Sequence, residues 1–217
     1  MPQTSLIEVK HEWQSAWSDP VFRSKFVIGF FLVMATLASF PFFFQWIELR
    51  HGAALEDPIL RWLPAHDVSV PLFIMIWAVS GLALVRAIQN PRILLVFFWS
   101  YVLLSFLREL TIALVPLDPP ANLIGLVDPL SNFFYGPKFV TKDLFPSGHT
   151  ATMFLLYFCL TGKGDKLLAL LVTFGVAFLL LVQHVHYTVD ILGGFLYGWF
   201  AWWAMTHTVA REQLIRD

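Results

Sequence analysis

Charge is scarce in this chain. Asp, Glu, Lys and Arg together make up 13% of its 217 residues, about half of the fraction that is typical of soluble domains. Hydrophobic residues make up 58%, and the mean hydropathy is +0.68. A soluble fold could not cover so much apolar surface, so the sequence predicts an integral membrane protein whose partners include the lipid bilayer.

Cysteine and clustered basic residues are equally scarce. The single cysteine, Cys159, lies in an apolar run, which excludes an internal disulfide. No basic patch interleaved with aromatic residues is present, so nucleic acid is not an expected partner. The N-terminus lacks the features of a cleaved signal peptide, and we expect the first apolar stretch to stay in the membrane.

Six apolar stretches predict helices that cross the membrane, a crossing that takes about 20 residues. In chain order they run from about Phe26 to Ile47, Val70 to Ala87, Ile93 to Val115, Ser147 to Gly162, Leu167 to His184 and Asp190 to Val209. The expected fold class is therefore an all-α integral membrane protein with six transmembrane helices.

The first 20 residues differ from the rest. Apolar side chains recur there at helical spacing, opposite a polar face, at Leu6, Val9, Trp13 and Trp17. This pattern is typical of an amphipathic helix that lies on a membrane surface. We therefore divide the chain into an interfacial helix over residues 1–20 and a single six-span catalytic membrane domain over residues 21–217.

The distribution of Lys and Arg predicts the orientation in the membrane, because cytoplasmic loops are enriched in both. One side of the six spans collects Lys10, Arg23, Lys25, Arg86, Arg92, Lys163, Lys166, Arg211 and Arg216. The other side collects Arg50, Arg61, Lys138 and Lys142. Both termini should therefore be cytoplasmic, with the polar ends of the third, fourth and sixth spans on the periplasmic, exoplasmic or lumenal face.

The fourth span opens on the polar segment Pro146-Ser147-Gly148-His149-Thr150. Ser147 is a typical helix N-cap, and Gly148 removes a side chain where the backbone must approach another group. The free N–H groups of the first helical turn form an anion site with the positive end of the helix dipole. His149 on that turn could then donate a proton to a bound phosphate. Taken alone, the segment is better explained as a helix cap with an incidental histidine.

A second polar segment, His184-Val185-His186-Tyr187-Thr188-Val189-Asp190, leads into the sixth span. If it is helical, His186 and Asp190 share a face, and Asp190 can hold one ring nitrogen while the other acts as a nucleophile. If the helix breaks here, the contact can form but the spacing does not require it. His184 should point to the other side. A polar pair that serves the structure alone is the alternative.

The third span carries Arg108 and Glu109 near its end, at a depth where a charged pair needs a partner. Arginine binds phosphate through its planar guanidinium, whereas a structural pair with Glu109 is the alternative. Lys142 could add positive charge, or could be an ordinary solvated loop residue. The expected phosphate-binding residues are Arg108, Ser147, Gly148 and Lys142.

Three other classes of function compete with catalysis by these histidines. His149, His186 and Asp190 are residue types that bind zinc, but no further His, Cys or Glu on that face completes a site, and we expect neither a metal nor another cofactor. A transporter would place its polar groups near the membrane midplane, whereas these cluster at one face. A structural membrane protein would tolerate the loss of His186.

Together the segments resemble the membrane branch of the type 2 phosphatidic acid phosphatase superfamily, and within it the branch related to sphingomyelin synthases. The likeness covers roughly residues 100–205. It rests on Asp143 four residues before Ser147-Gly148-His149-Thr150, on the segment 184–190, and on Arg108-x-x-Thr111. The general phosphatases carry an arginine six residues before the second histidine, where this chain has Leu180. That departure fits the synthase branch better.

The resemblance implies six spans, an active site on the exoplasmic or lumenal face, no required metal, and a catalytic triad formed by His149, His186 and Asp190. Four further residues are expected to support the site through their neighbours: Asp143, Tyr187, His184 and Thr111. The expected reaction passes a phospholipid head group through a phosphohistidine to a lipid alcohol such as ceramide or diacylglycerol. With water as the acceptor, the same site would be a lipid phosphate phosphatase or a phospholipase C. A homo-oligomer is compatible with the sequence.

Overall fold

The computed structural model describes residues 6–126 and 140–209. These ranges are helical, and within them the only extended pairing is an isolated bridge between Ala53 and Leu117. The helices are α1 (Leu6–Ser18), α2 (Pro20–Glu48), α3 (Pro58–Trp62), α4 (Ser69–Gln89), α5 (Pro91–Leu114), α7 (Gly148–Cys159), α8 (Lys163–Val182) and α9 (Thr188–Thr208). The prediction of an all-α fold is confirmed for this part of the chain. Lys138, Arg211 and Arg216 lie outside the described residues.

In the described ranges, four helices are long and apolar enough to cross a membrane, namely α2, α4, α5 and α8. The six predicted spans are thus confirmed in part. The fourth predicted span is helical only over the 12 residues of α7, which is short of the roughly 20 that a crossing takes. The sixth corresponds to α9, which has 21 residues but is rich in Gly and Trp, residues less apolar than Leu or Phe.

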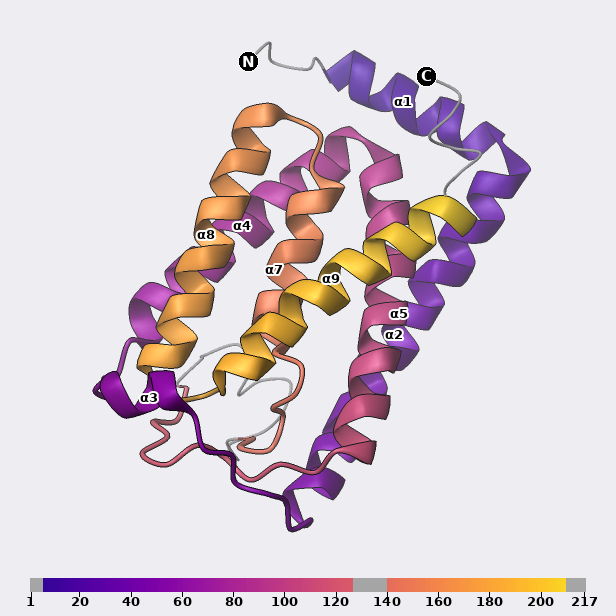
Figure 1. Ribbon diagram of the computed structural model, residues 1–217. Helices are drawn as coiled ribbons and strands as arrows, with labels where there is room; N and C mark the ends of the chain where they lie inside the picture. The colour runs from indigo at the N-terminus through magenta and orange to yellow at the C-terminus, as the bar shows by residue number, and fades with distance from the viewer. Residues whose placement is uncertain (1–5, 127–139, 210–217) are drawn as a thin grey trace.

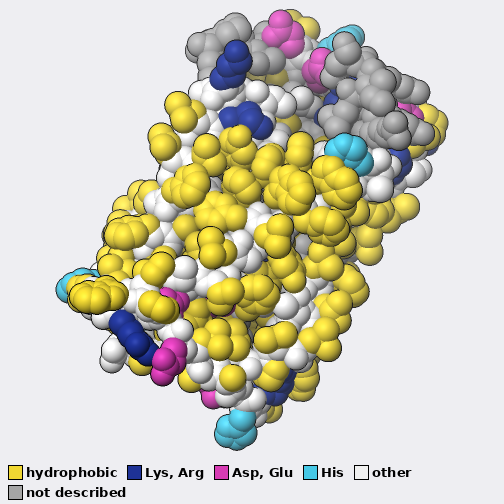
Figure 2. Space-filling view, viewed as in Figure 1, with side chains coloured by type: hydrophobic (Ala, Val, Ile, Leu, Met, Phe, Trp, Pro, Cys, Tyr) yellow, Lys and Arg dark blue, Asp and Glu magenta, His cyan; other side chains and the backbone are white. Residues whose placement is uncertain are grey.

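The long helices run alternately up and down, so that their ends gather at two opposite ends of the molecule (Figure 1). α7 lies at the centre and packs mainly against α9 and α8, while α2 packs against α5. α1 and the last turn of α9 lie at one end, and α3 lies at the other. Figure 2 shows hydrophobic side chains over the middle of the visible face, with the charged side chains near its two ends. This is the surface that a bilayer requires.

Three helices begin with the same sequence device, an Asp or Asn followed by Pro. Asp19 caps α2, Asp57 caps α3 and Asn90 caps α5, each by accepting a hydrogen bond from the backbone two residues on. Proline at the first helical position needs no N–H partner and has its φ angle already set. Because Asp19 starts the helix, α2 begins at Pro20, six residues before the predicted start at Phe26.

The N-terminal helix was predicted over residues 1–20, and α1 is found within that range. It folds back on the bundle. The Trp13 indole N–H donates to the carbonyl oxygen of Ile88 at 2.7 Å, at the end of α4, and the rings of Trp13 and Trp17 contact Phe26. Leu6 remains 88% exposed. The helix itself is therefore confirmed, and its position on a membrane surface stays a prediction.

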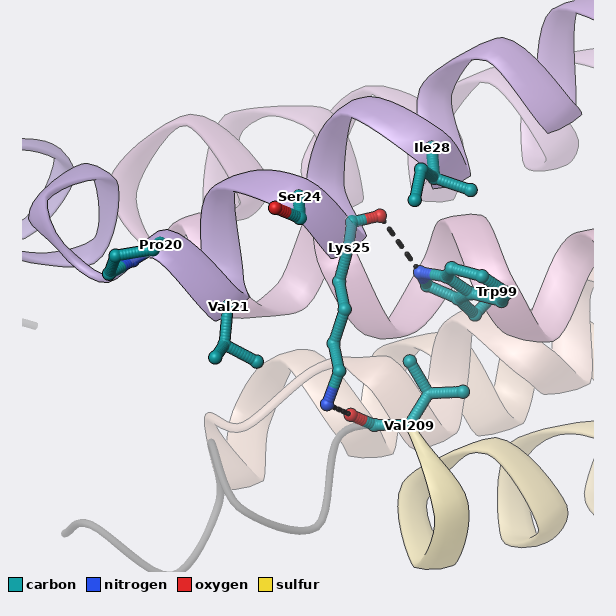
Figure 3. Close-up of a pocket in the computed structure, with 7 residues that line it drawn as sticks. All are labelled: Pro20, Val21, Ser24, Lys25, Ile28, Trp99 and Val209. Atoms are coloured by element: carbon teal, nitrogen blue, oxygen red, sulfur yellow. Dashed lines mark hydrogen bonds between the residues drawn. The ribbon is translucent and has the colours of Figure 1, made fainter.

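At the same end of the bundle, α2, α5 and α9 are joined by two hydrogen bonds around an apolar groove of about 480 Å³ (Figure 3). The Lys25 ammonium donates to the carbonyl oxygen of Val209, just after α9, at 2.7 Å. The Trp99 indole N–H of α5 donates to the backbone carbonyl oxygen of Lys25 at 3.0 Å. A cation at the C-terminal end of a helix is favourable because of the helix dipole.

Glycines on α9 allow α7 to approach it closely. A Cβ added at Gly198 would lie 2.6 Å from the carbonyl oxygen of Ala151, and one added at Gly194 would lie 2.9 Å from that of Ser147. Neither contact can relax by rotating a side chain, because both involve backbone atoms. The start of α7, with its polar residues, is therefore held directly against the first half of α9.

We expect Gly198→Ala to lower the free energy of unfolding by about 1–3 kcal/mol, because the added methyl group forces α7 and α9 apart. The thermal unfolding midpoint of the purified protein in detergent micelles measures this change. Gly81→Ala on α4 is the matched control, since a Cβ there meets nothing within 4 Å in the described structure. Equal midpoints for the two variants would contradict the close packing of α7 against α9.

Candidate active site

The histidine and acid of the second polar segment are brought together just before α9. The helix breaks after α8, His184 takes a φ of 55°, and α9 begins only at Thr188, so His186 lies outside a helix. His186 Nδ1 nevertheless lies 3.3 Å from Asp190 Oδ2, and both side chains are buried. The predicted contact is confirmed, although it spans a helix start rather than a helical turn.

Asp190 holds its position through its backbone as well as through its side chain. Its Oδ2 atom also accepts a hydrogen bond from the Tyr187 N–H group at 2.9 Å, which caps α9. Its carbonyl oxygen accepts a hydrogen bond from the Ser147 N–H group at 2.9 Å. The imidazole of His186 is thus oriented by an aspartate that is held once through its carboxylate and once through its backbone carbonyl. A carboxylate that orients a histidine is also the arrangement of catalytic acid–histidine pairs.

The same Ser147–Asp190 hydrogen bond brings the first polar segment to the second. Ser147 is fully buried and caps α7, where its Oγ accepts from the Thr150 N–H group at 3.4 Å and lies 3.1 Å from Thr150 Oγ1. The predicted N-cap is confirmed. His149 follows on the first turn of α7, where its ring and that of Phe73 on α4 are in a T-shaped arrangement. The two histidine-bearing segments therefore meet at the N-termini of α7 and α9.

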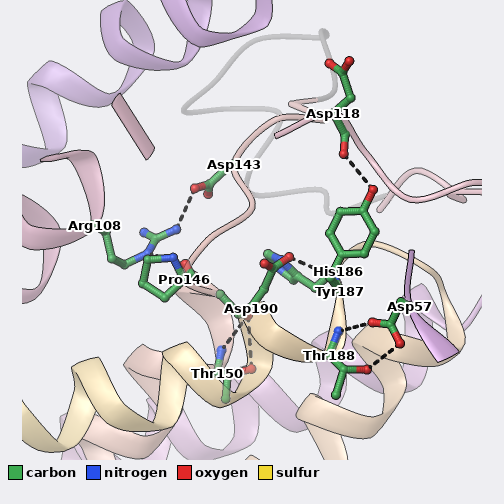
Figure 4. A network of polar contacts seen from close by, with 11 residues as sticks. Asp57, Arg108, Asp118, Asp143, Pro146, Thr150, His186, Tyr187, Thr188 and Asp190 are labelled. Carbon is green, nitrogen blue, oxygen red and sulfur yellow. Dashed lines mark hydrogen bonds and ion pairs between the residues drawn. The ribbon is translucent and has the colours of Figure 1, made fainter. Parts of the chain in front are cut away.

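Arg108 of α5 lies against the N-terminus of α7 (Figure 4). Its side chain is buried, with Nε donating to the carbonyl oxygen of Pro146 at 3.1 Å and Nη2 donating to Asp143 Oδ1 at 2.6 Å. A Cβ added at Gly148 would lie 2.6 Å from the guanidinium carbon. A side chain at Gly148 would therefore displace the guanidinium, which packs on the Gly148 backbone and pairs with Asp143.

In the described ranges, only two of the three guanidinium nitrogens of Arg108 donate hydrogen bonds to protein atoms. Nη1 makes no hydrogen bond to any residue in the described ranges, whereas Nε and Nη2 are held by Pro146 and Asp143. A guanidinium has five N–H donors, so a bound anion can still be contacted. The start of α7 lies beside it, and the positive end of the helix dipole favours negative charge there. These groups together form a candidate phosphate site.

Lys142 binds residues of the loops after α2 and α5. Its ammonium lies 3.0 Å from Asp118 Oδ1 and also donates to the carbonyl oxygen of Arg50, while its backbone N–H donates to Glu48 Oε1 at 2.8 Å. It therefore ties the loop before α7 to the end of α2 and to the loop after α5. Within the described part of the chain, the Lys142 ammonium makes no hydrogen bond or ion pair with Arg108 or with the start of α7. The phosphate-binding role of Lys142 stays a prediction.

Three of the residues expected to support the site, Thr111, Tyr187 and His184, join separate elements of the fold. Thr111 of α5 lies 2.8 Å from the Tyr197 hydroxyl of α9, oxygen to oxygen. The Tyr187 hydroxyl donates to the carbonyl oxygen of Asp118 at 3.0 Å and accepts from the Leu55 N–H group. The His184 ring is buried between two backbone carbonyl oxygens from distant loops. Each contact fixes a segment next to His186, Asp190 or Arg108.

One polar residue of this network, Asp57, was missed by the sequence analysis. It accepts from the backbone N–H of Thr188 at 2.6 Å and from its hydroxyl at 3.1 Å, next to the His186–Asp190 pair (Figure 4). The Asp57-Pro58 pair does signal a helix start. It indicates the cap of α3, but nothing local indicates a partner 131 residues further along the chain.

The pKa of Asp57 follows from these contacts. Burial alone would raise it, but the hydrogen bonds from Thr188, Leu60 and Ile59 together outweigh burial and hold the pKa below its ordinary value of 3.8. Hydrogen bonds to a carboxylate favour the charged form. Asp57 therefore remains a carboxylate under ordinary conditions.

No group of three or more His, Cys, Asp or Glu side chains in residues 6–126 and 140–209 is arranged to hold a metal ion. The zinc interpretation of His149, His186 and Asp190 therefore gains no support from the described residues.

A sequence model of the PAP2 superfamily matches residues 93–214, which is more than half of the chain. The match includes Arg108, the Ser147–Thr150 segment and the His186–Asp190 pair, whereas Asp57 lies outside it. The comparison with curated proteins gives no match, and the comparison with solved structures gives none either.

The lowered pKa of Asp57 predicts an acid dependence of stability. Because the folded-state pKa lies below the unfolded value, the contribution of this carboxylate is fully present above about pH 4 and is lost as the pH falls through the lowered pKa. Thermal unfolding midpoints measured between about pH 5 and pH 3 should therefore fall less steeply for Asp57→Asn than for wild type. The neighbouring Glu56→Gln should follow the wild-type curve, and parallel curves for all three proteins would contradict the assignment.

Proposed function

This chain belongs to the PAP2 superfamily, and on that premise we propose that it transfers a phospholipid head group to a lipid alcohol, in the manner of sphingomyelin or ceramide phosphoethanolamine synthases. Superfamily membership is compatible with both phosphatase and phosphotransferase chemistry on lipids. The proposal rests on the buried His186–Asp190 pair, which one backbone hydrogen bond joins to the N-terminus of α7. Its substrates are a phospholipid donor and a lipid alcohol such as ceramide or diacylglycerol.

The first step forms a bond between His186 and phosphorus. Asp190 holds Nδ1, and Nε2 makes no hydrogen bond to the described residues. Nε2 attacks the phosphorus of the donor head group, and the bond from phosphorus to the diacylglycerol oxygen breaks. His149 gives its proton to that oxygen. Such general-acid assistance contributes about 10²–10⁴ in rate.

The second step returns the site to its starting state. The hydroxyl oxygen of the acceptor lipid attacks the phosphohistidine, the bond from phosphorus to His186 breaks, and His149 takes the proton of the hydroxyl. Through both steps, Arg108 and the N-terminal N–H groups of α7 hold the oxygens of the transferring group. Donors placed beforehand around such oxygens stabilise the negative charge that they carry in the transition state.

The runner-up function is hydrolysis at the same site. If water takes the place of the lipid alcohol in the second step, the protein is a lipid phosphate phosphatase or a phospholipase C. The two functions differ in the acceptor alone and share His186, His149 and Arg108. Analysis of the products therefore distinguishes them.

The proposed placement in the membrane has six spans, with α7 and α9 completing the bundle formed by α2, α4, α5 and α8. Both termini and α1 lie on the cytoplasmic side, where Lys and Arg are enriched. The start of α7, the start of α9 and α3 then lie on the periplasmic, exoplasmic or lumenal side. The support is the structure's separation of the helix ends into two groups.

Replacing the proposed catalytic residues should have graded effects on turnover of labelled phosphatidylcholine or phosphatidylethanolamine, supplied with and without ceramide. His186→Asn should abolish both turnover and the acid-labile phosphate trapped on the protein. His149→Gln should lower kcat by about 10²–10⁴, because only acid–base assistance is lost. Labelled lipid product indicates transfer, whereas released water-soluble head-group phosphate indicates hydrolysis.

The matched control is His207→Gln, which removes an exposed histidine from the far end of α9 and should retain full turnover. Chelation with EDTA should leave the rate unchanged. Full turnover by His186→Asn would remove the proposed nucleophile. Loss of activity with EDTA and recovery with zinc would replace the proposal by the metal interpretation.

Cysteine labelling tests the proposed orientation in the membrane. In a Cys159→Ser background, Trp62→Cys at the end of α3 and Leu6→Cys on α1 introduce thiols at positions that are 89% and 88% exposed. In intact cells, an impermeant maleimide should label the first and not the second; permeabilisation should expose both. Labelling of Leu6→Cys alone in intact cells would reverse the proposed orientation.

A further inference from the structure

The segment that carries His186 is fastened on both sides of that residue to two loops at the same end of the bundle. On one side, the His184 ring nitrogens lie 2.8 Å from the Leu63 carbonyl oxygen and 3.0 Å from the Ala121 carbonyl oxygen. On the other side, Thr188 binds Asp57. The loop between α2 and α4, residues 49–68, supplies a contact on each side.

Asp57 is unusual among these contacts because one carboxylate serves two helices. Its Oδ1 accepts from the N–H groups of Ile59 and Leu60 at 2.9 and 3.3 Å, which caps α3. The same carboxylate accepts from both the N–H and the hydroxyl of Thr188, the first residue of α9. Asp57 therefore fixes the start of α9 relative to α3.

The start of α9 is also the segment whose geometry the proposed chemistry requires. Asp190 binds the Tyr187 N–H group while Asp57 binds the next one, that of Thr188. Two carboxylates thus hold successive N–H groups of one helix start. The distance of 3.3 Å between His186 and Asp190 is at the long end of the hydrogen-bond range. A small shift of the first turn of α9 would break that contact.

We propose that Asp57 is a positioning residue, which holds the first turn of α9 so that Asp190 meets His186 in the geometry needed for attack on phosphorus. The inference rests on the proposed function of that pair. Asp57 acts through Thr188 and does not touch the reacting atoms. Misplacing a catalytic group by about 1 Å can lower the rate by roughly 10²-fold without weakening substrate binding.

The kinetic test compares four variants of the full-length protein in nanodiscs with a labelled phospholipid donor and ceramide. Asp57→Asn should lower kcat at least tenfold and leave KM within twofold of wild type. Thr188→Val, which keeps the Asp57 cap of α3 and removes only the hydroxyl donor, should cause a smaller fall, and Thr188→Ser should restore the rate. Glu56→Gln should match wild type, because Glu56 pairs only with Arg61 on the surface in the described structure.

A second readout does not depend on catalysis. Hydrogen–deuterium exchange of the peptide covering residues 184–190 should be faster in Asp57→Asn than in wild type, and unchanged in Glu56→Gln. If Asp57→Asn does not fold, Thr188→Val carries both measurements. Wild-type kcat in the folded Asp57→Asn protein, or a rise in KM with unchanged kcat, would overturn the positioning role.

The same two readouts separate this inference from the proposed function. If wild type turns over no phospholipid and traps no phosphate, the proposed function fails, and exchange that is the same in wild type and Asp57→Asn would overturn the positioning role as well. If wild type is active and Asp57→Asn is equally active, only the positioning role fails. Faster exchange together with a selective loss of kcat supports both.

Discussion

The backbone hydrogen bond from Ser147 to Asp190 is the contact on which the rest of the site depends. It joins the N-terminal ends of α7 and α9, which each carry partial positive charge. At the start of α9, two carboxylates of the chain balance this positive charge, since Asp190 and Asp57 both bind the first N–H groups there. α7 has no acidic residue in its first turn, and Arg108 lies against it. The start of α7 therefore favours a negatively charged group.

Small residues make this meeting of helices sterically possible. Gly148 admits the Arg108 guanidinium, and Gly194 and Gly198 let α9 approach the backbone of α7. A methyl group at any of the three positions would lie under 3.0 Å from a neighbouring atom. The close packing therefore also makes the electrostatics possible. The Arg108 guanidinium and the two helix starts can lie side by side only because these glycines have no side chains.

Local chemistry explains what could be predicted from the sequence. The helices follow from apolar length and from caps such as Ser147. The spacing of His186 and Asp190 suggests a contact along one helical turn, and the contact forms instead across the start of α9. The sequence does not show where the helix breaks before α9, because the position of that break depends on the hydrogen bonds that Thr188 makes. That partner is Asp57, and contacts of this kind are set by how loops meet in space. Lys142 shows the same limit, since its charge suits phosphate and Asp118 equally well.

The shortness of α7 has a consequence for how a ligand reaches the site. A helix of 12 residues is about 18 Å long, well below the roughly 30 Å of a hydrocarbon core. In Figure 1 the lower end of α7 stops short of the lower ends of α8 and α5. The N-terminal end of α7, where the candidate phosphate site lies, is therefore set back from the ends of those two helices. A lipid can bring its phosphorus to that depth by sideways diffusion in its own leaflet, keeping its acyl chains in the bilayer, whereas a water-soluble phosphate ester would have to leave the aqueous phase.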